Sequence, residues 1–163
     1  MTSRADFTDA EWERLGRAPL LVGAAVSMAD PGGPIDALKE TSAALQTVVD
    51  AAQSGDRGPF VQAVAADVAE RARRRESPLG SFRPDPARAR DQILDELRAV
   101  NALLQRKTTP AETAAFREWL KVAAQSTALA AKEGGFLGFG GEQVSEREQQ
   151  MLEELGGIFG EPG

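Results

Sequence analysis

The chain has 163 residues, about the length of one domain, and carries a net charge of −6 at neutral pH. It contains neither cysteine nor histidine, which excludes disulfides, thiolate metal sites, a Ser-His-Asp triad and a di-iron site built on Glu-x-x-His pairs. The acidic total also argues against general nucleic-acid binding, because DNA and RNA phosphates would repel such a surface.

The first predicted elements are two helices separated by a proline. Thr8 and Glu11 form a capping-box pattern that predicts a short helix from Asp9 to about Arg17. Pro19 lacks a backbone donor, so we expect a break or kink near Ala18. The next stretch, residues 19–29, is apolar on nearly every face and is therefore predicted to be the central helix. Its eleven residues are too few to cross a bilayer, which needs about 20.

The remaining elements follow the same helical periodicity. Apolar spacings of three, four and seven residues predict helices over residues 35–54, 59–75, 93–104, 110–130 and 145–155, with a proline-containing loop at 76–86. Thr109 is the expected N-cap of the fourth of these helices. No segment alternates with period two. The expected fold is all-α, a compact bundle of about six to seven helices in one domain spanning residues 1–163, with loose tails at 1–7 and 160–163.

Residues 133–141 form the most unusual segment, because five glycines surround Phe136, Leu137 and Phe139. One interpretation is structural: the apolar side chains plug the core while the glycines take positive φ angles. The other is functional: the three side chains present an adaptable apolar surface to a peptide, a lipid or a partner protein. The sequence leaves both open.

A basic island interrupts the acidic chain. Residues 71–90 hold seven arginines and two acids, and Arg71, Arg74 and Arg75 lie at the predicted end of a helix. Acids at positions 67 and 70 precede Arg71 and Arg74 by four residues, so i,i+4 ion pairs are expected to neutralise part of the island. The island is then either a solvated helix end or a docking patch for an acidic partner or a phosphate group.

Acidic residues flank two turns and give the alternative function, a site for Ca²⁺, Mg²⁺ or Mn²⁺. The candidate ligands are Asp30 and Asp36 at the first turn, and Glu133, Glu142 and Glu146 at the last. Hard cations need several oxygen ligands brought together by a tight turn. Neither segment has the EF-hand pattern, and surface acids or helix caps explain the same residues.

The two acidic turns also carry a resemblance. Residues 29–35 (Ala-Asp-Pro-Gly-Gly-Pro-Ile) and 131–135 (Ala-Lys-Glu-Gly-Gly), followed by 144–148 (Val-Ser-Glu-Arg-Glu), resemble the tellurite-resistance TerB-like family over about a quarter of the chain. The resemblance implies a small all-α acidic domain with metal bound at those acids. The whole chain also resembles small helical proteins of high-GC bacteria.

Together these features predict a non-enzymatic interaction or scaffold protein with a protein partner and no cofactor. Without histidine or cysteine, the catalytic groups of an enzyme would have to be residues such as Lys132 and Glu133. The sequence shows no set of catalytic residues that includes them. The start of the chain lacks an apolar signal region, so a cytoplasmic location is expected. The apolar stripe from Ile93 to Leu104 fits either the core or a dimer seam, so the chain is expected to be a monomer or a homodimer.

Overall fold

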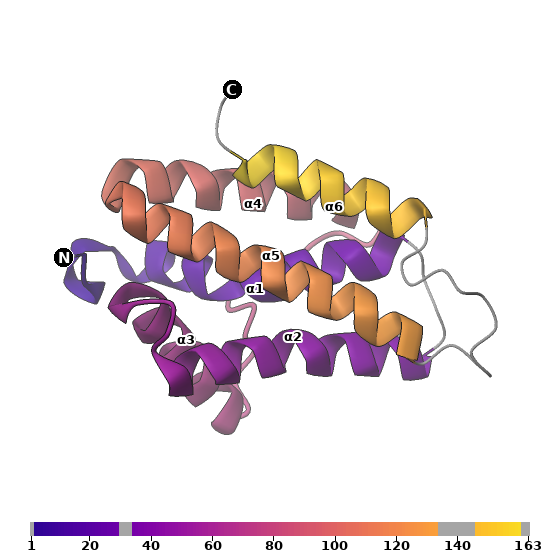
Figure 1. Ribbon diagram of the computed structural model, residues 1–163, viewed down its shortest axis with the longest axis horizontal. Coiled ribbons are helices and arrows are strands. Elements are labelled where there is room, and N and C mark those ends of the chain that lie inside the picture. Colours follow the sequence, from indigo (N-terminus) through magenta and orange to yellow (C-terminus); the bar gives the residue numbers. More distant parts are fainter. Residues whose placement is uncertain (1, 30–33, 134–145, 161–163) are drawn as a thin grey trace.

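The computed structural model describes residues 2–29, 34–133 and 146–160, and the side chains of residues 34–40 and 131–133 lie outside that description. Within these ranges its regular secondary structure is all helical, with no strand (Figure 1), as predicted. A short 3-10 helix, η1 (Arg4–Asp6), precedes six α-helices: α1 (Asp9–Ala29), α2 (Pro34–Ser54), α3 (Pro59–Arg73), α4 (Ala89–Lys107), α5 (Pro110–Glu133) and α6 (Glu146–Phe159). No helix of the described part has both the length and the apolar character that crossing a bilayer requires.

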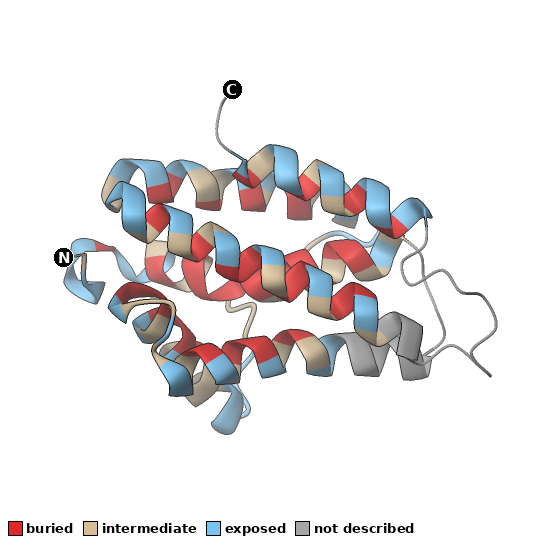
Figure 2. Cartoon of the chain, in the orientation of Figure 1, coloured by how far each residue is buried: buried red, intermediate tan, exposed pale blue. Residues whose placement is uncertain are grey.

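Helix α1 is the centre of the bundle. It contacts all five other α-helices, with α4 and α6 along one side and α2 and α3 along the other (Figure 1). Its buried residues include Leu15, Ala18, Leu21 and Val22. Figure 2 shows that the buried positions of the neighbouring helices turn toward it. This confirms the prediction that residues 19–29 form a central apolar helix.

The expected break near Ala18 is wrong, because α1 runs through Pro19 without interruption. Proline removes one intrahelical hydrogen bond and costs about 3 kcal/mol in an isolated helix. Here Leu15, Ala18 and Leu21 are all buried on the same helix, and burying a large apolar side chain returns about 1.5–3 kcal/mol. Tertiary packing therefore outweighs the local penalty.

Two helix starts have capping boxes, one at the predicted capping box of Thr8 and one at the predicted N-cap Thr109. At α1, the Glu11 amide donates to Thr8 Oγ1 (3.1 Å) and the Thr8 amide donates to Glu11 Oε1 (2.9 Å). At α5, Glu112 and Thr109 exchange the same pair of bonds at 3.1 and 3.4 Å. The sequence Ser-Glu-Arg-Glu at residues 145–148 also has the capping-box pattern, but Ser145 lies outside the described residues.

The N-terminal segment differs from the loose tail that we expected for residues 1–7. Phe7 is only 6% exposed and packs against the rings of Trp12 and Phe60. The Thr2 amide donates to Glu112 Oε1 at 3.0 Å. A large aromatic side chain close to the start of α1 thus anchors residues that polar composition alone marked as a tail. Residues 161–163 lie outside the description.

Two glycines of α1 allow its neighbours to come close. A Cβ at Gly23 would lie 3.1 Å from Thr127 Oγ1 of α5 and 3.2 Å from Ala44 Cβ of α2. A Cβ at Gly16 would lie 3.0 Å from Val68 Cγ2 of α3. The central helix therefore needs small residues where three helices press on it.

The stripe from Ile93 to Leu104 is buried in the same core, which favours the core interpretation over a dimer seam.

Candidate functional site

A cavity of about 320 Å³ opens between α5 and α6, and we call it the α5–α6 groove. Residues 114–125 of α5 form one wall, residues 152–160 form the other, and Val22 of α1 contributes to the floor. The two walls are joined to the rest of the bundle through α1, on which both helices pack. A volume of this size lies at the lower end of the range for ligand-binding pockets.

Large apolar side chains form the floor of the groove. Leu120 and Leu155 are buried, Phe159 is 9% exposed, and Leu152 is half-buried. These side chains come from the inward faces of α5 and α6, where heptad-like spacing places them over α1. An apolar floor between two helices favours the binding of apolar groups.

Small residues keep the groove open along its walls. Ala114 and Ala124 line it on α5, and Gly156 and Gly160 line it on the other wall. A Cβ placed at Gly156 would meet no heavy atom within 4 Å, and the same holds for its neighbour Gly157. The missing side chain at Gly156 therefore leaves space that a leucine or phenylalanine would occupy.

The rim of the groove on α5 is polar. Arg117 is half-buried, and its Nε donates to Asn101 Oδ1 of α4 at 3.0 Å. Lys121 and Glu118 are exposed. Among the described residues, none of these three rim charges takes part in an ion pair. The groove thus presents two cations and one carboxylate that remain available to a binding partner.

Our sequence reasoning did not select the groove residues as a site. The available signal was the pair Gly156–Gly157 inside an otherwise regular amphipathic helix, which costs about 1 kcal/mol per glycine relative to alanine. From the sequence, these two glycines make the end of the last helix uncertain, which is why the helix predicted over 145–155 stops before them. The relative placement of α5 and α6, which makes the groove, leaves no trace in local periodicity.

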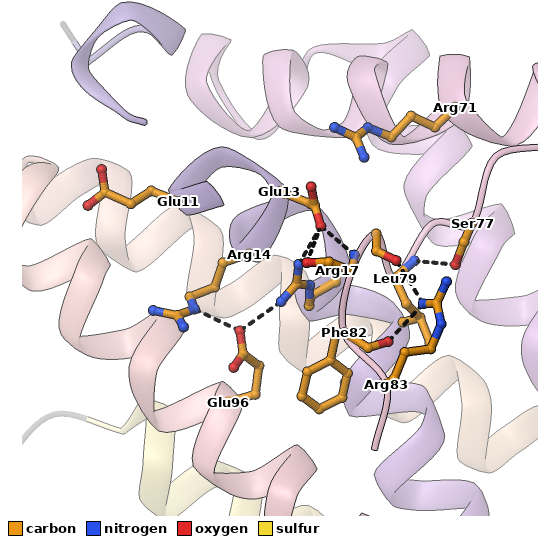
Figure 3. A network of polar contacts seen from close by, with 12 residues as sticks. Glu11, Glu13, Arg14, Arg17, Arg71, Ser77, Leu79, Phe82, Arg83 and Glu96 are labelled. Atoms are coloured by element: carbon orange, nitrogen blue, oxygen red, sulfur yellow. Dashed lines mark hydrogen bonds and ion pairs between the residues drawn. The ribbon is translucent and has the colours of Figure 1, made fainter. Parts of the chain in front are cut away.

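A second group of charged side chains lies between α1, α4 and the α3–α4 loop (residues 74–88), and we call it the α1–loop cluster (Figure 3). Arg17, only 6% exposed, pairs with Glu13 at 2.8 Å and with Glu96 at 3.1 Å. Arg14 pairs with the same Glu96 oxygen at 2.7 Å. The Arg17 Nε atom has no hydrogen-bond partner among the described residues.

The cluster fastens the loop to α1. The Ser81 amide and hydroxyl both donate to Glu13 Oε1, at 2.6 and 3.0 Å, and the Phe82 ring centroid lies 5.5 Å from the Arg17 guanidinium carbon. The Ser81 amide, more than any other group, holds the pKa of Glu13 below its ordinary value, with Arg17 contributing and burial opposing. The cluster therefore has a structural role, because its paired charges hold the α3–α4 loop against α1.

Three of the seven arginines of the predicted basic island, Arg71, Arg73 and Arg74, pair with acids of α3. Arg71 Nε lies 3.1 Å from Asp67 Oδ2, and Arg74 Nε lies 3.2 Å from Glu70 Oε1, which confirms the expected i,i+4 pairs. Arg75 is exposed and adopts a φ of 59° just after the helix. Such pairs agree with a solvated helix end. A docking role for Arg71, Arg74 and Arg75 stays a prediction.

Most of the other sequence candidates fall outside the structural description. Phe136, Leu137 and Phe139 lie beyond the described residues, as do Asp30 and Glu142. The backbone of Asp36 and Glu133 is helical, but their side chains are not described. Glu146 is exposed at the start of α6.

The metal site likewise stays a prediction. Among the described residues, no three His, Cys, Asp or Glu side chains lie close enough together to hold a metal ion. Comparison of the chain with protein-family models, with curated protein sequences and with solved structures gave no match in any of the three cases.

Proposed function

We propose that this protein is a non-enzymatic binding protein and that the α5–α6 groove receives the apolar face of a helix from a partner protein. The single observation that carries the proposal is the groove itself, an apolar cavity of about 320 Å³ between two helices. Its walls include the exposed residues Ala114 and Gly156, so a partner can reach the floor from solvent. This arrangement corresponds to recognition of an amphipathic helix by a groove.

The length of the groove supports a helical occupant. The lining residues 114–125 of α5 extend over roughly 17 Å, and residues 152–160 over roughly 12 Å, at about 1.5 Å per residue. Two turns of a partner helix rise by about 11 Å. A partner would therefore place two or three apolar side chains, at positions i, i+4 and i+7, along the floor.

The small wall residues support the same occupant. Ala114, Ala124, Gly156 and Gly160 project little into the groove, and helices approach to about 8 Å only where the residues between them are small. Each large apolar side chain that the partner buries contributes about 1.5–3 kcal/mol. Two or three such anchors contribute roughly 3–9 kcal/mol, which offsets much of the roughly 4–15 kcal/mol that association costs.

The chemistry of the lining supports binding rather than catalysis. The ionisable groups of the groove are Arg117, Glu118 and Lys121. A single carboxylate between two cations supplies no pair of groups whose environments would set one as acid and the other as base. An enzyme would need a nucleophile beside a base, and the lining contains no serine, threonine or cysteine.

The test has two steps. Peptides that bind the chain are selected first, and a substitution then places a side chain of the protein itself in the groove. A displayed library of helical peptides about 15 residues long, a length at which helices begin to persist in water, is selected on the full-length chain. The dissociation constants of the selected peptides are measured by fluorescence anisotropy. We expect peptides with apolar residues at i, i+4 and i+7.

A matched pair of variants tests whether these peptides occupy the groove. Gly156→Leu places a side chain in the groove, whereas Gly157→Leu places the same side chain at a residue that does not line it. We expect Gly156→Leu to weaken binding at least about tenfold, equivalent to 1.4 kcal/mol, and Gly157→Leu to change it less than about twofold.

Three outcomes would overturn the proposal. One is that no selected peptide depends on Gly156, and another is that both leucine variants weaken binding equally. The third comes from sedimentation of the chain alone: a dimer that Gly156→Leu dissociates would identify a second copy of the chain as the occupant.

A further inference from the structure

The charges on the rim of the α5–α6 groove narrow the class of partner helix. Arg117 and Lys121 lie one helical turn apart on α5, and both line the groove. Most of the other described cations, such as Arg90 of α4 and Lys107, form ion pairs with carboxylates of this chain. Two cations that lack such partners therefore border an apolar groove in a chain whose net charge is −6.

The geometry of Arg117 prepares it to bind an anion. Its Nε donates to Asn101 Oδ1 at 3.0 Å, which fixes the guanidinium against α4. Its two terminal nitrogens make no hydrogen bond to described residues. A guanidinium held at Nε keeps these two nitrogens as a planar fork that matches a carboxylate, and less rotational entropy is lost when the carboxylate binds.

We infer that the α5–α6 groove selects a partner helix carrying an aspartate or glutamate within one turn of its apolar anchors, with Arg117 binding that carboxylate. Lys121 adds a second positive charge one turn further along α5. Glu118 carries the opposite sign on the same rim and disfavours an acid placed beside it, so the three charges together set the register of the partner. The inference rests on the proposed function, because it concerns the same groove.

The test compares an acidic peptide with a neutral copy. A selected peptide is made a second time with every Asp and Glu replaced by Asn and Gln, and both peptides are titrated onto the full-length chain. We expect Arg117→Gln to weaken the acidic peptide about tenfold and the neutral peptide less than about twofold, since a carboxylate–guanidinium pair is lost only in the first complex. Arg117→Lys keeps the charge without the fork and should recover only part of the loss.

The other rim charges should act with opposite signs. Lys121→Gln should weaken the acidic peptide about threefold, and Glu118→Gln should strengthen it about threefold. The control is Arg98→Gln, which removes an exposed arginine of α4 that does not line the groove, and it should leave both peptides unchanged. Raising the salt concentration should weaken the acidic peptide more than the neutral one.

The outcomes separate this inference from the proposed function. If Arg117→Gln and Lys121→Gln change the two peptides equally while Gly156→Leu still abolishes binding, the carboxylate inference is overturned and the groove proposal stands. If Gly156→Leu has no effect on either peptide, both are overturned. Selected peptides that show no enrichment of Asp or Glu near their apolar residues would also contradict the inference.

Discussion

The α1–loop cluster and the α5–α6 groove both place arginine side chains beside apolar residues, but they differ in what neutralises the charge. In the cluster, Arg17 is buried between Glu13 and Glu96, and the loop residue Ser81 completes the hydrogen bonds of Glu13. In the groove, Arg117 bonds to a neutral asparagine, and no carboxylate of the described chain pairs with it.

The difference indicates which region is structural and which is available for binding. A buried charge is tolerated only when its partners are in place, and both carboxylates that neutralise Arg17 in the cluster belong to the chain itself. Arg117, on the rim of the apolar groove, has no such carboxylate partner among the described residues, and a Cβ at Gly156 on the opposite wall would meet open space.

The largest effect is expected from neutralising a carboxylate inside the cluster. Glu96→Gln removes the negative charge shared by Arg14 and Arg17 and should lower the free energy of unfolding by about 3 kcal/mol, because a buried cation loses a partner. Its neighbour in sequence, Asp95, is 75% exposed and pairs with Arg98. Asp95→Asn should cost less than about 1 kcal/mol.

Urea denaturation of the two variants measures both values. Equal and small losses for Glu96→Gln and Asp95→Asn would show that the cluster is not a buried ionic unit.

The next effect concerns the loop that the cluster holds. Gly80 has a φ of 61°, and a Cβ there would collide with Glu13 Oε1. Gly80→Ala should therefore cost about 2 kcal/mol, from the left-handed backbone penalty of about 1–2 kcal/mol together with displaced Glu13–Ser81 bonds. Hydrogen exchange at the Ser81 amide should become faster. Gly58 also has a positive φ but open space around it, so Gly58→Ala serves as the control for backbone strain alone and should leave Ser81 exchange unchanged.

A smaller effect of opposite sign is expected at the groove. Gly156→Leu and Gly157→Leu each replace a helical glycine whose Cβ would meet open space, so each should raise the free energy of unfolding by up to about 1 kcal/mol. Thermal unfolding checks the gain. Increased stability together with lost peptide binding, seen for Gly156→Leu and not for Gly157→Leu, would mark Gly156 as a functional position. A loss of stability at Gly156 would contradict an empty groove.

The smallest effect is a pH dependence at the N-terminal end of α1. The hydrogen bond from Lys107 Nζ (2.8 Å) and then that from the Thr8 amide lower the pKa of Glu11 from 4.5 to about 2. A lowered pKa stabilises the folded state fully above pH 4.5, and this contribution is lost as the pH falls from about 4.5 to about 2.

The stability difference between the parent chain and Glu11→Gln should therefore shrink across that interval, as followed by urea denaturation at several pH values. Salt should reduce the difference, because the Lys107 side chain is 30% exposed. A difference that stays constant down to pH 2 would refute the assignment.

Local sequence features predicted much of the fold. The capping boxes at Thr8 and Thr109 mark helix starts because they depend on residues three positions apart. The continuity of α1 through Pro19 was not predictable in this way, because it depends on burial against five other helices. The anchoring of Phe7 beside Phe60 similarly requires contacts far apart in sequence.

The two charged regions were harder to predict than the helices. Arg17 and Glu96 are 79 positions apart, and nothing in the pattern of either helix indicates that they meet. The groove arises from the spacing between α5 and α6, for which the glycine at position 156 was the only local sign. The arginines of residues 71–75 are conspicuous in the composition, yet Arg71 and Arg74 pair with acids of α3.

The most direct test of the central claim is to locate a bound partner helix on the chain. The full-length protein, labelled with ¹⁵N, is titrated with a selected acidic peptide, and amide shifts are followed by NMR. If the peptide binds in the groove, the largest changes in amide chemical shift should fall on residues 114–125 of α5 and on residues 152–160 of the opposite wall. The amides of the α3–α4 loop should keep their chemical shifts. Shifts concentrated on the α3–α4 loop, with α5 and α6 unaffected, would contradict the central claim.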